Sequence, residues 1–133
     1  MQIIDGKKLS QTIKEELNQE VQKIKEKNQK IPHLAAILIG DDPASHVYVR
    51  NKVRSCEQCG FKSTLIQRDS SVSEEDLLKI VGQLNEDEDI DGFIVQLPLP
   101  DHIDDEKVTL AIDPRKDVDG FHPSSVGNLV IGK

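Results

Sequence analysis

Two side chains that could exchange a proton, Tyr48 and Lys52, are four residues apart in the sequence. Asp42 is a good helix N-cap and Pro43 suits the first helical position, so a helix is predicted to begin here. Residues four apart on a helix share one face, which would set a phenol hydroxyl beside an amine. The pair could act as an acid and a base, or it could be an ordinary surface pair.

An amide stands where a third buried segment ends. Gln96 directly follows the apolar run 93–95, and Pro98 and Pro100 stiffen the loop after it. A glutamine at this position can both donate and accept hydrogen bonds, so it could orient an amine or a heterocycle. The alternative is that it only satisfies backbone groups of the loop.

A carboxylate completes the set of candidate groups. Asp117 and Asp119 alternate along an extended segment, so only one of them can face a cleft. We expect Asp119 to accept hydrogen bonds from an amino-substituted ring, or merely to begin a turn before Gly120.

Strand and helix patterns alternate along the chain and would position these groups. Apolar runs predict strands at 33–39, 61–67 and 93–95, the second nearer a sheet edge. Helices are predicted at 5–28, 43–60, 73–85 and 104–112, with helical potential at 123–133. A short strand running into a turn is predicted at 116–121. The apolar stripe of the first helix is Leu9, Ile13, Leu17, Val21 and Ile24.

Alternation of this kind predicts one α/β domain spanning residues 1–133. The expected architecture is three-layer α-β-α, with a small, mostly parallel sheet of three to four strands. Proteins with such sheets bind their ligands in a crevice just beyond the carboxyl ends of the strands. We therefore expect the segments 40–52, 96–100 and 117–122 to converge there.

The composition excludes several functions. Net charge is −7 and aromatic residues make up 3% of the chain, which argues against a nucleic-acid or anionic-membrane partner. There is no apolar run long enough to span a membrane, and the start of the chain does not resemble a secretory leader. A cytoplasmic protein is expected.

Cys56 and Cys59 form a Cys-x-x-Cys near the end of a predicted helix. The helix dipole there opposes thiolate formation, and no second cysteine pair could complete a zinc site. We expect thiols that only pack. The sequence predicts neither a metal site nor a Gly-x-Gly-x-x-Gly dinucleotide fingerprint.

Three blocks of sequence amount to a family resemblance. These blocks are 43–52 (PASHVYVRNK), 95–100 (VQLPLP) and 116–122 (KDVDGFH). In this order and spacing they closely resemble the bifunctional methylenetetrahydrofolate dehydrogenase/methenyltetrahydrofolate cyclohydrolase (FolD-type) family. The resemblance covers essentially the whole chain but only the amino-terminal half of a family member. Intact members continue into a Rossmann domain that binds NADP, or NAD in some, and we expect no cofactor to bind the present chain alone.

The resemblance implies an enzyme of one-carbon folate metabolism. Its substrates would be tetrahydrofolate derivatives: 5,10-methylenetetrahydrofolate is oxidised to the 5,10-methenyl form, which is then hydrolysed to 10-formyltetrahydrofolate. The present chain would supply the folate-binding half with the catalytic lysine, and the full-length protein would be a homodimer. The alternative is a non-catalytic folate-binding or regulatory domain. A receiver-like signalling domain is disfavoured because its third strand should end in aspartate, not Gln96.

The resemblance also assigns roles to residues. Lys52 would be the catalytic lysine, Tyr48 its hydroxyl partner, and Gln96 the amide that hydrogen-bonds it. Asp119 would bind the amino group and ring nitrogen of the pterin. The folate would also contact the run that follows Gln96, which consists of Leu97, Pro98, Leu99 and Pro100.

Overall fold

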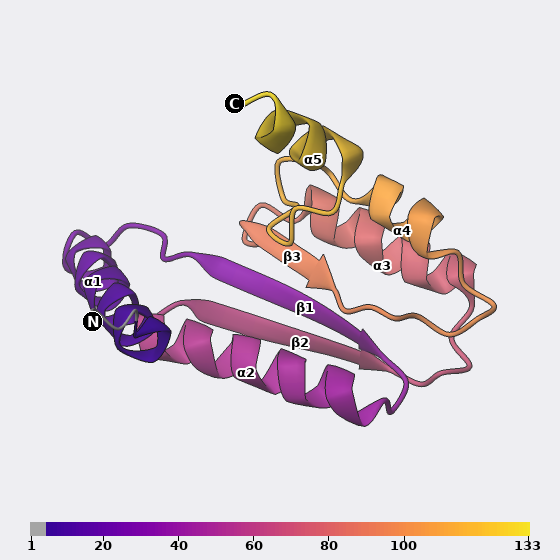
Figure 1. The fold of residues 1–133 in the computed structure, drawn as a ribbon, viewed down its shortest axis with the longest axis horizontal. Coiled ribbons are helices and arrows are strands. Elements are labelled where there is room, and N and C mark those ends of the chain that lie inside the picture. Colours follow the sequence, from indigo (N-terminus) through magenta and orange to yellow (C-terminus); the bar gives the residue numbers. More distant parts are fainter. Residues whose placement is uncertain (1–4) are drawn as a thin grey trace.

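The computed structural model describes residues 5–133, whose centre is a three-stranded parallel sheet in the order β2-β1-β3 (Figure 1). The strands are β1 (His33–Ile39), β2 (Lys62–Arg68) and β3 (Gly92–Val95). His33 of β1 lies opposite Lys62 of β2, and Leu34 lies opposite Gly92 of β3. The predicted α/β class and parallel sheet are confirmed.

Within residues 5–133, five helices accompany the sheet. In Figure 1, α2 covers one face, while α3 and α4 lie together over the other. This is the predicted three-layer arrangement. The bounds of the helices are α1 (Gly6–Glu26), α2 (Pro43–Cys59), α3 (Glu74–Glu86), α4 (Asp105–Ala111) and α5 (Pro123–Val130).

β1 is the central strand of the sheet, so nearly all of its residues are buried. Side chains of a strand alternate between its two faces. Ala35, Ile37 and Ile39 therefore pack in the core cluster under α3 and α4, whereas Ala36 and Leu38 pack in the cluster under α2. β2 is largely exposed and lies at the sheet edge, as its weaker apolar pattern predicted.

The start of α2 follows the predicted capping. The Asp42 carboxylate accepts a hydrogen bond from the Ser45 amide at 2.7 Å, and Pro43 occupies the first turn. Gly60 ends the helix in the left-handed conformation, with φ of 80°. These two signals fix the start and the end of the helix that carries Tyr48 and Lys52.

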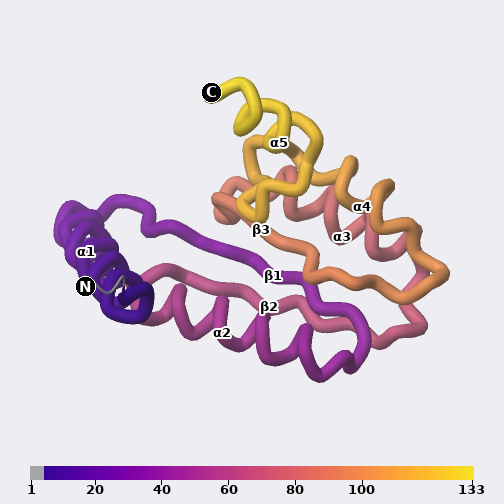
Figure 2. Tube along the Cα trace, in the orientation of Figure 1, coloured from indigo at the N-terminus to yellow at the C-terminus, as the bar shows by residue number. Residues whose placement is uncertain are grey.

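The apolar stripe of α1 is only partly used. Val21 is buried, but Leu9, Ile13 and Leu17 are each more than 40% exposed. Figure 2 shows the reason: α1 lies beside the carboxyl end of α2 and not over the sheet. Among its contacts there, Asn18 donates a hydrogen bond to the Gln58 carbonyl at 3.0 Å.

The predicted strand at 116–121 is wrong. This segment makes a single parallel bridge, between Asp117 and Phe93 of β3, and then turns. Aspartate and glycine are disfavoured in strands, and the segment contains two aspartates and one glycine. The chain turns directly after the bridge, so no further residues pair with β3. After it, α5 forms despite Gly127, but none of its residues is buried.

Among residues 5–133, no helix is both long and apolar enough to cross a membrane.

Candidate functional site

One cavity, of about 250 Å³, is lined by side chains from all three segments that were expected to converge. It opens beside the carboxyl end of β3, between the middle of α2 and the turn that follows Asp117. The turn at Gly40 and Asp41 does not line it. The lining residues are Tyr48, Lys52, Gln96, Leu97, Asp119 and Phe121.

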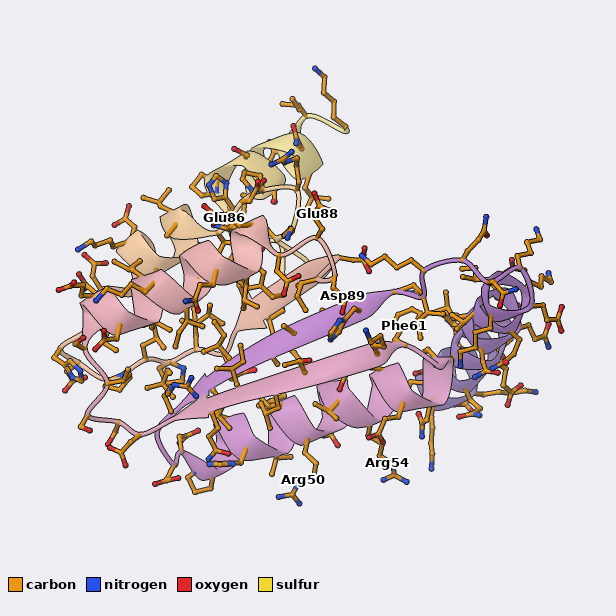
Figure 3. All side chains as sticks on the ribbon, turned by 180° about the vertical axis from the view of Figure 1, so that it is seen from behind. Arg50, Arg54, Phe61, Glu86, Glu88 and Asp89 are labelled. Atoms are coloured by element: carbon orange, nitrogen blue, oxygen red, sulfur yellow. The ribbon has the colours of Figure 1, made fainter. Side chains whose placement is uncertain are left out.

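α2 supplies the phenol and the amine. Val49 is fully buried against the sheet, which fixes the rotation of the helix and turns Tyr48 and Lys52 toward the cavity. The outer face of the same helix carries Arg50 and Arg54, which point away from the sheet (Figure 3). Within residues 5–133 no hydrogen bond joins the Tyr48 hydroxyl to Lys52, so the two share the cavity without a direct bond.

The Lys52 ammonium is paired across the cavity. Its Nζ lies 3.3 Å from Oδ1 of Asp119, and the two side chains are 34% and 29% exposed. A long, partly solvated ion pair contributes little to stability. An incoming ligand with its own hydrogen-bond donors could therefore displace Lys52 from Asp119 at a small energetic cost.

Gln96 presents an acceptor that has no partner in the part of the chain that the structure describes. Its backbone amide continues the pairing with β1 by donating to the Ile37 carbonyl at 2.9 Å. Its side-chain Nε2 donates to the Leu97 carbonyl at 2.8 Å, so Oε1, at the other side of the amide, faces away from that carbonyl. Oε1 is buried and unpaired. A buried acceptor of this kind costs about 1–3 kcal/mol, which a donor from a ligand or from Lys52 would offset.

The run after Gln96 divides its side chains between the cavity and the core. Leu97 lines the cavity, and the peptide bond between Leu97 and Pro98 is cis. Pro98 is exposed and Pro100 half-buried, whereas Leu99 packs into the core under α3 and α4. Of the four residues of this run, only Leu97 lines the cavity, and contact of all four with folate stays a prediction.

The two aspartates of the turn have different surroundings. Asp119 lines the cavity, while the Asp117 carboxylate accepts hydrogen bonds from the Gly120 and His122 amides and from Ser125 Oγ. The alternation along the segment predicted that only one would face a cleft.

Sequence reasoning missed Phe121. Its ring is 59% exposed, yet it lines the cavity, as does Tyr48, which is 63% exposed. The chain has only four aromatic residues, and two of them stand at this cavity. The scarcity of aromatics, with one next to the Asp119-Gly120 turn, was the signal that could have identified it. Exposed aromatic rings suit contact with a planar ligand.

Larger hollows lie elsewhere: two of about 510 and 560 Å³ along α1, and one of about 460 Å³ between the end of α3 and Lys116. The two along α1 are also lined by amines, amides and carboxylates, but these come from α1 itself, its N-cap Asp5 and Gln58. In the third, the Lys116 ammonium is already bound to the carbonyls of Leu84 and Asp87. We assign the site to the smaller cavity because its groups come from three distant segments and can act on one ligand.

The cysteine pair has no part in the site. Cys56 and Cys59 are both buried and free, and burial together with the neighbouring Cys59 raises the pKa of the Cys56 thiol. A raised pKa disfavours the reactive thiolate, in agreement with a packing role. Within residues 5–133 no cluster of His, Cys, Asp or Glu could hold a metal ion.

Comparison with known proteins identifies the family. Residues 4–119 match the model of the tetrahydrofolate dehydrogenase/cyclohydrolase catalytic domain. The chain is 58% identical over 131 residues to the bifunctional protein FolD of Cytophaga hutchinsonii, covering 98% of this chain and 45% of that protein.

Solved structures agree with the match in sequence. The FolD methylenetetrahydrofolate dehydrogenase/cyclohydrolase of Campylobacter jejuni superposes with a TM-score of 0.91 at 46% identity, over 96% of this chain and 45% of that one. The Trypanosoma brucei FolD, solved with NADP and an inhibitor, gives a TM-score of 0.92 at 36% identity, over 98% and 44%.

The chain thus spans about half the length of the curated relatives it matches. The family that the three sequence blocks resembled is confirmed by the family model, by sequence identity and by fold. The chain belongs to the tetrahydrofolate dehydrogenase/cyclohydrolase family, whose catalytic domain it matches.

Proposed function

We propose that this chain is the folate-binding and catalytic half of a methylenetetrahydrofolate dehydrogenase and methenyltetrahydrofolate cyclohydrolase. The observation that carries the proposal is the single cavity shared by an amine, a phenol, an amide and a carboxylate. The relatives named FolD, and the dehydrogenase/cyclohydrolase titles of the matching structures, support the same activity.

Asp119 is proposed to bind the pterin. The amino group and the adjacent ring nitrogen of a reduced pterin both carry hydrogens, and a carboxylate accepts two such bonds side by side. Ligand binding therefore competes with the 3.3 Å pair to Lys52. Once displaced, the Lys52 amine can donate to the unpaired Oε1 of Gln96, which lines the same cavity.

Lys52 is proposed to be the base of the hydrolytic step. The 5,10-methenyl group is a cation, and a neighbouring cation favours the neutral amine over the ammonium. The neutral amine takes a proton from water as the water oxygen bonds to the cationic carbon. The C–N5 bond of the resulting carbinolamine then breaks as N5 takes a proton from the Lys52 ammonium and the hydroxyl proton is lost to solvent. This leaves the 10-formyl product, with Tyr48 and Gln96 holding the amine in line.

The oxidative step uses the same bound folate. NADP, when bound, would supply the acceptor for the hydride of the methylene carbon, and the contribution of the cavity would be to orient the folate. The sequence carries no dinucleotide fingerprint. We therefore assign NADP binding to the half of the relatives that this chain does not cover. A homodimer and a cytoplasmic location belong to the same proposal for the full-length protein.

The test is Lys52→Met in a full-length family member that carries this chain as its first half. We expect hydrolysis of 5,10-methenyltetrahydrofolate to fall by at least about 100-fold, a typical contribution of a general base. Hydride transfer should fall much less, because it needs geometry and no base. Both rates are measured spectroscopically on one preparation.

Lys7→Met is the matched control, since this exposed lysine on α1 is remote from the cavity. It should leave both activities unchanged. Equal losses of the two activities in Lys52→Met would contradict the division of roles. Full hydrolysis in that variant would leave only a folate-binding function for the cavity.

A further inference from the structure

The turn that carries Asp119 is folded around one carboxylate, that of Asp117. Its Oδ1 accepts a hydrogen bond from the Gly120 amide at 3.0 Å. Its Oδ2 accepts from the His122 amide at 3.0 Å and from Ser125 Oγ at 2.7 Å. These donors come from the turn itself, from the N-cap of α5 and from its first turn, so one side chain connects the whole segment.

The start of this segment is fixed to the sheet. Asp117 forms the parallel bridge with Phe93, whose amide donates to the Lys116 carbonyl at 3.0 Å. The Lys116 ammonium in turn donates to the carbonyls of Leu84 and Asp87, at 2.8 and 2.6 Å, where α3 ends. The Asp117 side chain is therefore a fixed point from which the following residues can be positioned.

The residues positioned by this carboxylate are those of the cavity. Asp119 and Phe121 both line it, and between them Gly120 has a positive φ of 75°. The segment belongs to no helix or strand and buries little: Val118 and Phe121 are 55% and 59% exposed. Besides the carboxylate, the described structure holds this segment only through the long Lys52–Asp119 pair and the contact of Val118 with Gly92.

We infer that Asp117 is a positioning residue for the folate site, setting the placement of Asp119 and Phe121 through the hydrogen bonds that its carboxylate accepts. This inference rests on the proposed function, because it assigns to Asp119 the binding of the pterin. Asp117 itself does not line the cavity.

The charge of Asp117 suits this role. Burial raises the pKa of the Asp117 carboxyl, but hydrogen bonds from Ser125 and from the amides of His122, Gly120 and Phe121 more than offset it and hold the pKa below its ordinary value. The group is thus ionised at neutral pH and acts only as an acceptor, which matches donors on both of its oxygens.

The decisive variant is Asp117→Asn in the 133-residue chain, titrated with 5-formyltetrahydrofolate as the folate probe. Asparagine has nearly the size of aspartate, but one of its two oxygens is replaced by an NH₂ group. That group cannot accept the hydrogen bonds that one side of the Asp117 carboxylate accepts. We expect the dissociation constant to rise about tenfold or more, as for the loss of hydrogen bonds to a charged group. Asp105→Asn is the matched control, since Asp105 is exposed on α4 and remote from the cavity.

A double-mutant cycle separates positioning from a merely structural role. If Asp117 acts chiefly through Asp119, the loss caused by Asp117→Asn and Asp119→Asn together should be smaller than the sum of the two single losses. Ser125→Ala removes one donor and should weaken binding less than Asp117→Asn does. Ser125→Thr keeps the hydroxyl donor and should bind like the unaltered chain. Urea unfolding of each variant shows whether the fold is intact.

The outcomes distinguish this inference from the proposed function. Weaker binding by Asp119→Asn with unchanged binding by Asp117→Asn would overturn the inference alone. Additive losses in the double variant would also overturn it, because Asp117 would then act independently of Asp119. Unchanged binding in both single variants would overturn the inference and the proposed function together.

Discussion

At the scale of single residues, the site combines one ion pair with one unsatisfied acceptor. Lys52 is held by Asp119, while the buried Oε1 of Gln96 in the same cavity has no partner within residues 5–133. A ligand that binds Asp119 releases the Lys52 amine, which can then donate a hydrogen bond to Oε1 of Gln96. Binding and preparation of the base would in this way be one event.

An unsatisfied buried acceptor predicts a trade between stability and function at Gln96. Gln96→Leu removes the unpaired oxygen but also the donor to the Leu97 carbonyl. These changes oppose each other, so the free energy of unfolding should stay within about 1 kcal/mol of the original. Folate binding should weaken, because the displaced Lys52 loses its acceptor.

Urea unfolding and a folate titration of the same Gln96→Leu preparation measure the two quantities. A large loss of stability together with unchanged binding would show that Gln96 is a structural strand end, which is the reading that the sequence had left open.

At the scale of elements, β3 and the Asp119 segment lie in close contact through Gly92. A Cβ at this position would lie 2.3 Å from Val118 Cγ1 and 3.3 Å from the Lys116 carbonyl oxygen. Both neighbours belong to the segment that leads to Asp119. The close approach of strand and segment therefore requires a residue without a side chain.

Gly92→Ala is accordingly expected to push the segment away from β3. The free energy of unfolding should fall by about 1–3 kcal/mol, as for other overpacked positions, and folate binding should weaken with it. Gly82→Ala in α3 is the control: nothing lies within 4 Å of the added Cβ, and alanine favours a helix by up to about 1 kcal/mol. A Gly92→Ala chain that is as stable and binds as tightly as the original would contradict the contact.

Local signals explain which elements could be predicted. Asp42 and Pro43 predicted the start of α2, and the continuous apolar run of β1 predicted the central strand. Both signals lie within a few residues of the element that they predict. The strand expected at 116–121 failed because the donors to Asp117 come from residues up to eight positions later, which no local pattern reveals. The exposure of Leu17 in α1 depends on where α1 packs, and that is a tertiary matter.

At the scale of the whole molecule, charge sets the dependence of stability on pH. Several carboxylates accept hydrogen bonds that hold their pKa values below the ordinary range; Asp89, for example, accepts from Lys62 and His33 at one end of the sheet (Figure 3). Lowered pKa values are found for Asp42, Asp69, Glu74, Asp76, Asp89, Asp91, Asp113 and Asp117.

Asp113 is the sharpest test of this dependence. Hydrogen bonds from the Arg115 side chain and backbone lower the pKa of Asp113 from 3.8 to about 2. Because the folded-state pKa lies below the unfolded one, the contribution to stability is present above about pH 4 and is lost as pH falls toward 2.

Asp113→Asn should therefore be less stable than the original at pH 7, and the difference should shrink between about pH 4 and about pH 2. Urea unfolding across this range measures it, with Asp105→Asn as a control that changes no such pair. A difference that stays constant with pH would contradict the assigned cause.

The central claim is that three segments distant in the sequence form one folate site on this chain. The most direct test is an NMR titration of the 133-residue chain with 5-formyltetrahydrofolate. If the three segments form one site, shifts should be confined to the middle of α2, to Gln96 and Leu97, and to the turn at 117–122. Shifts confined to the hollows along α1, or none at saturating ligand, would contradict the claim.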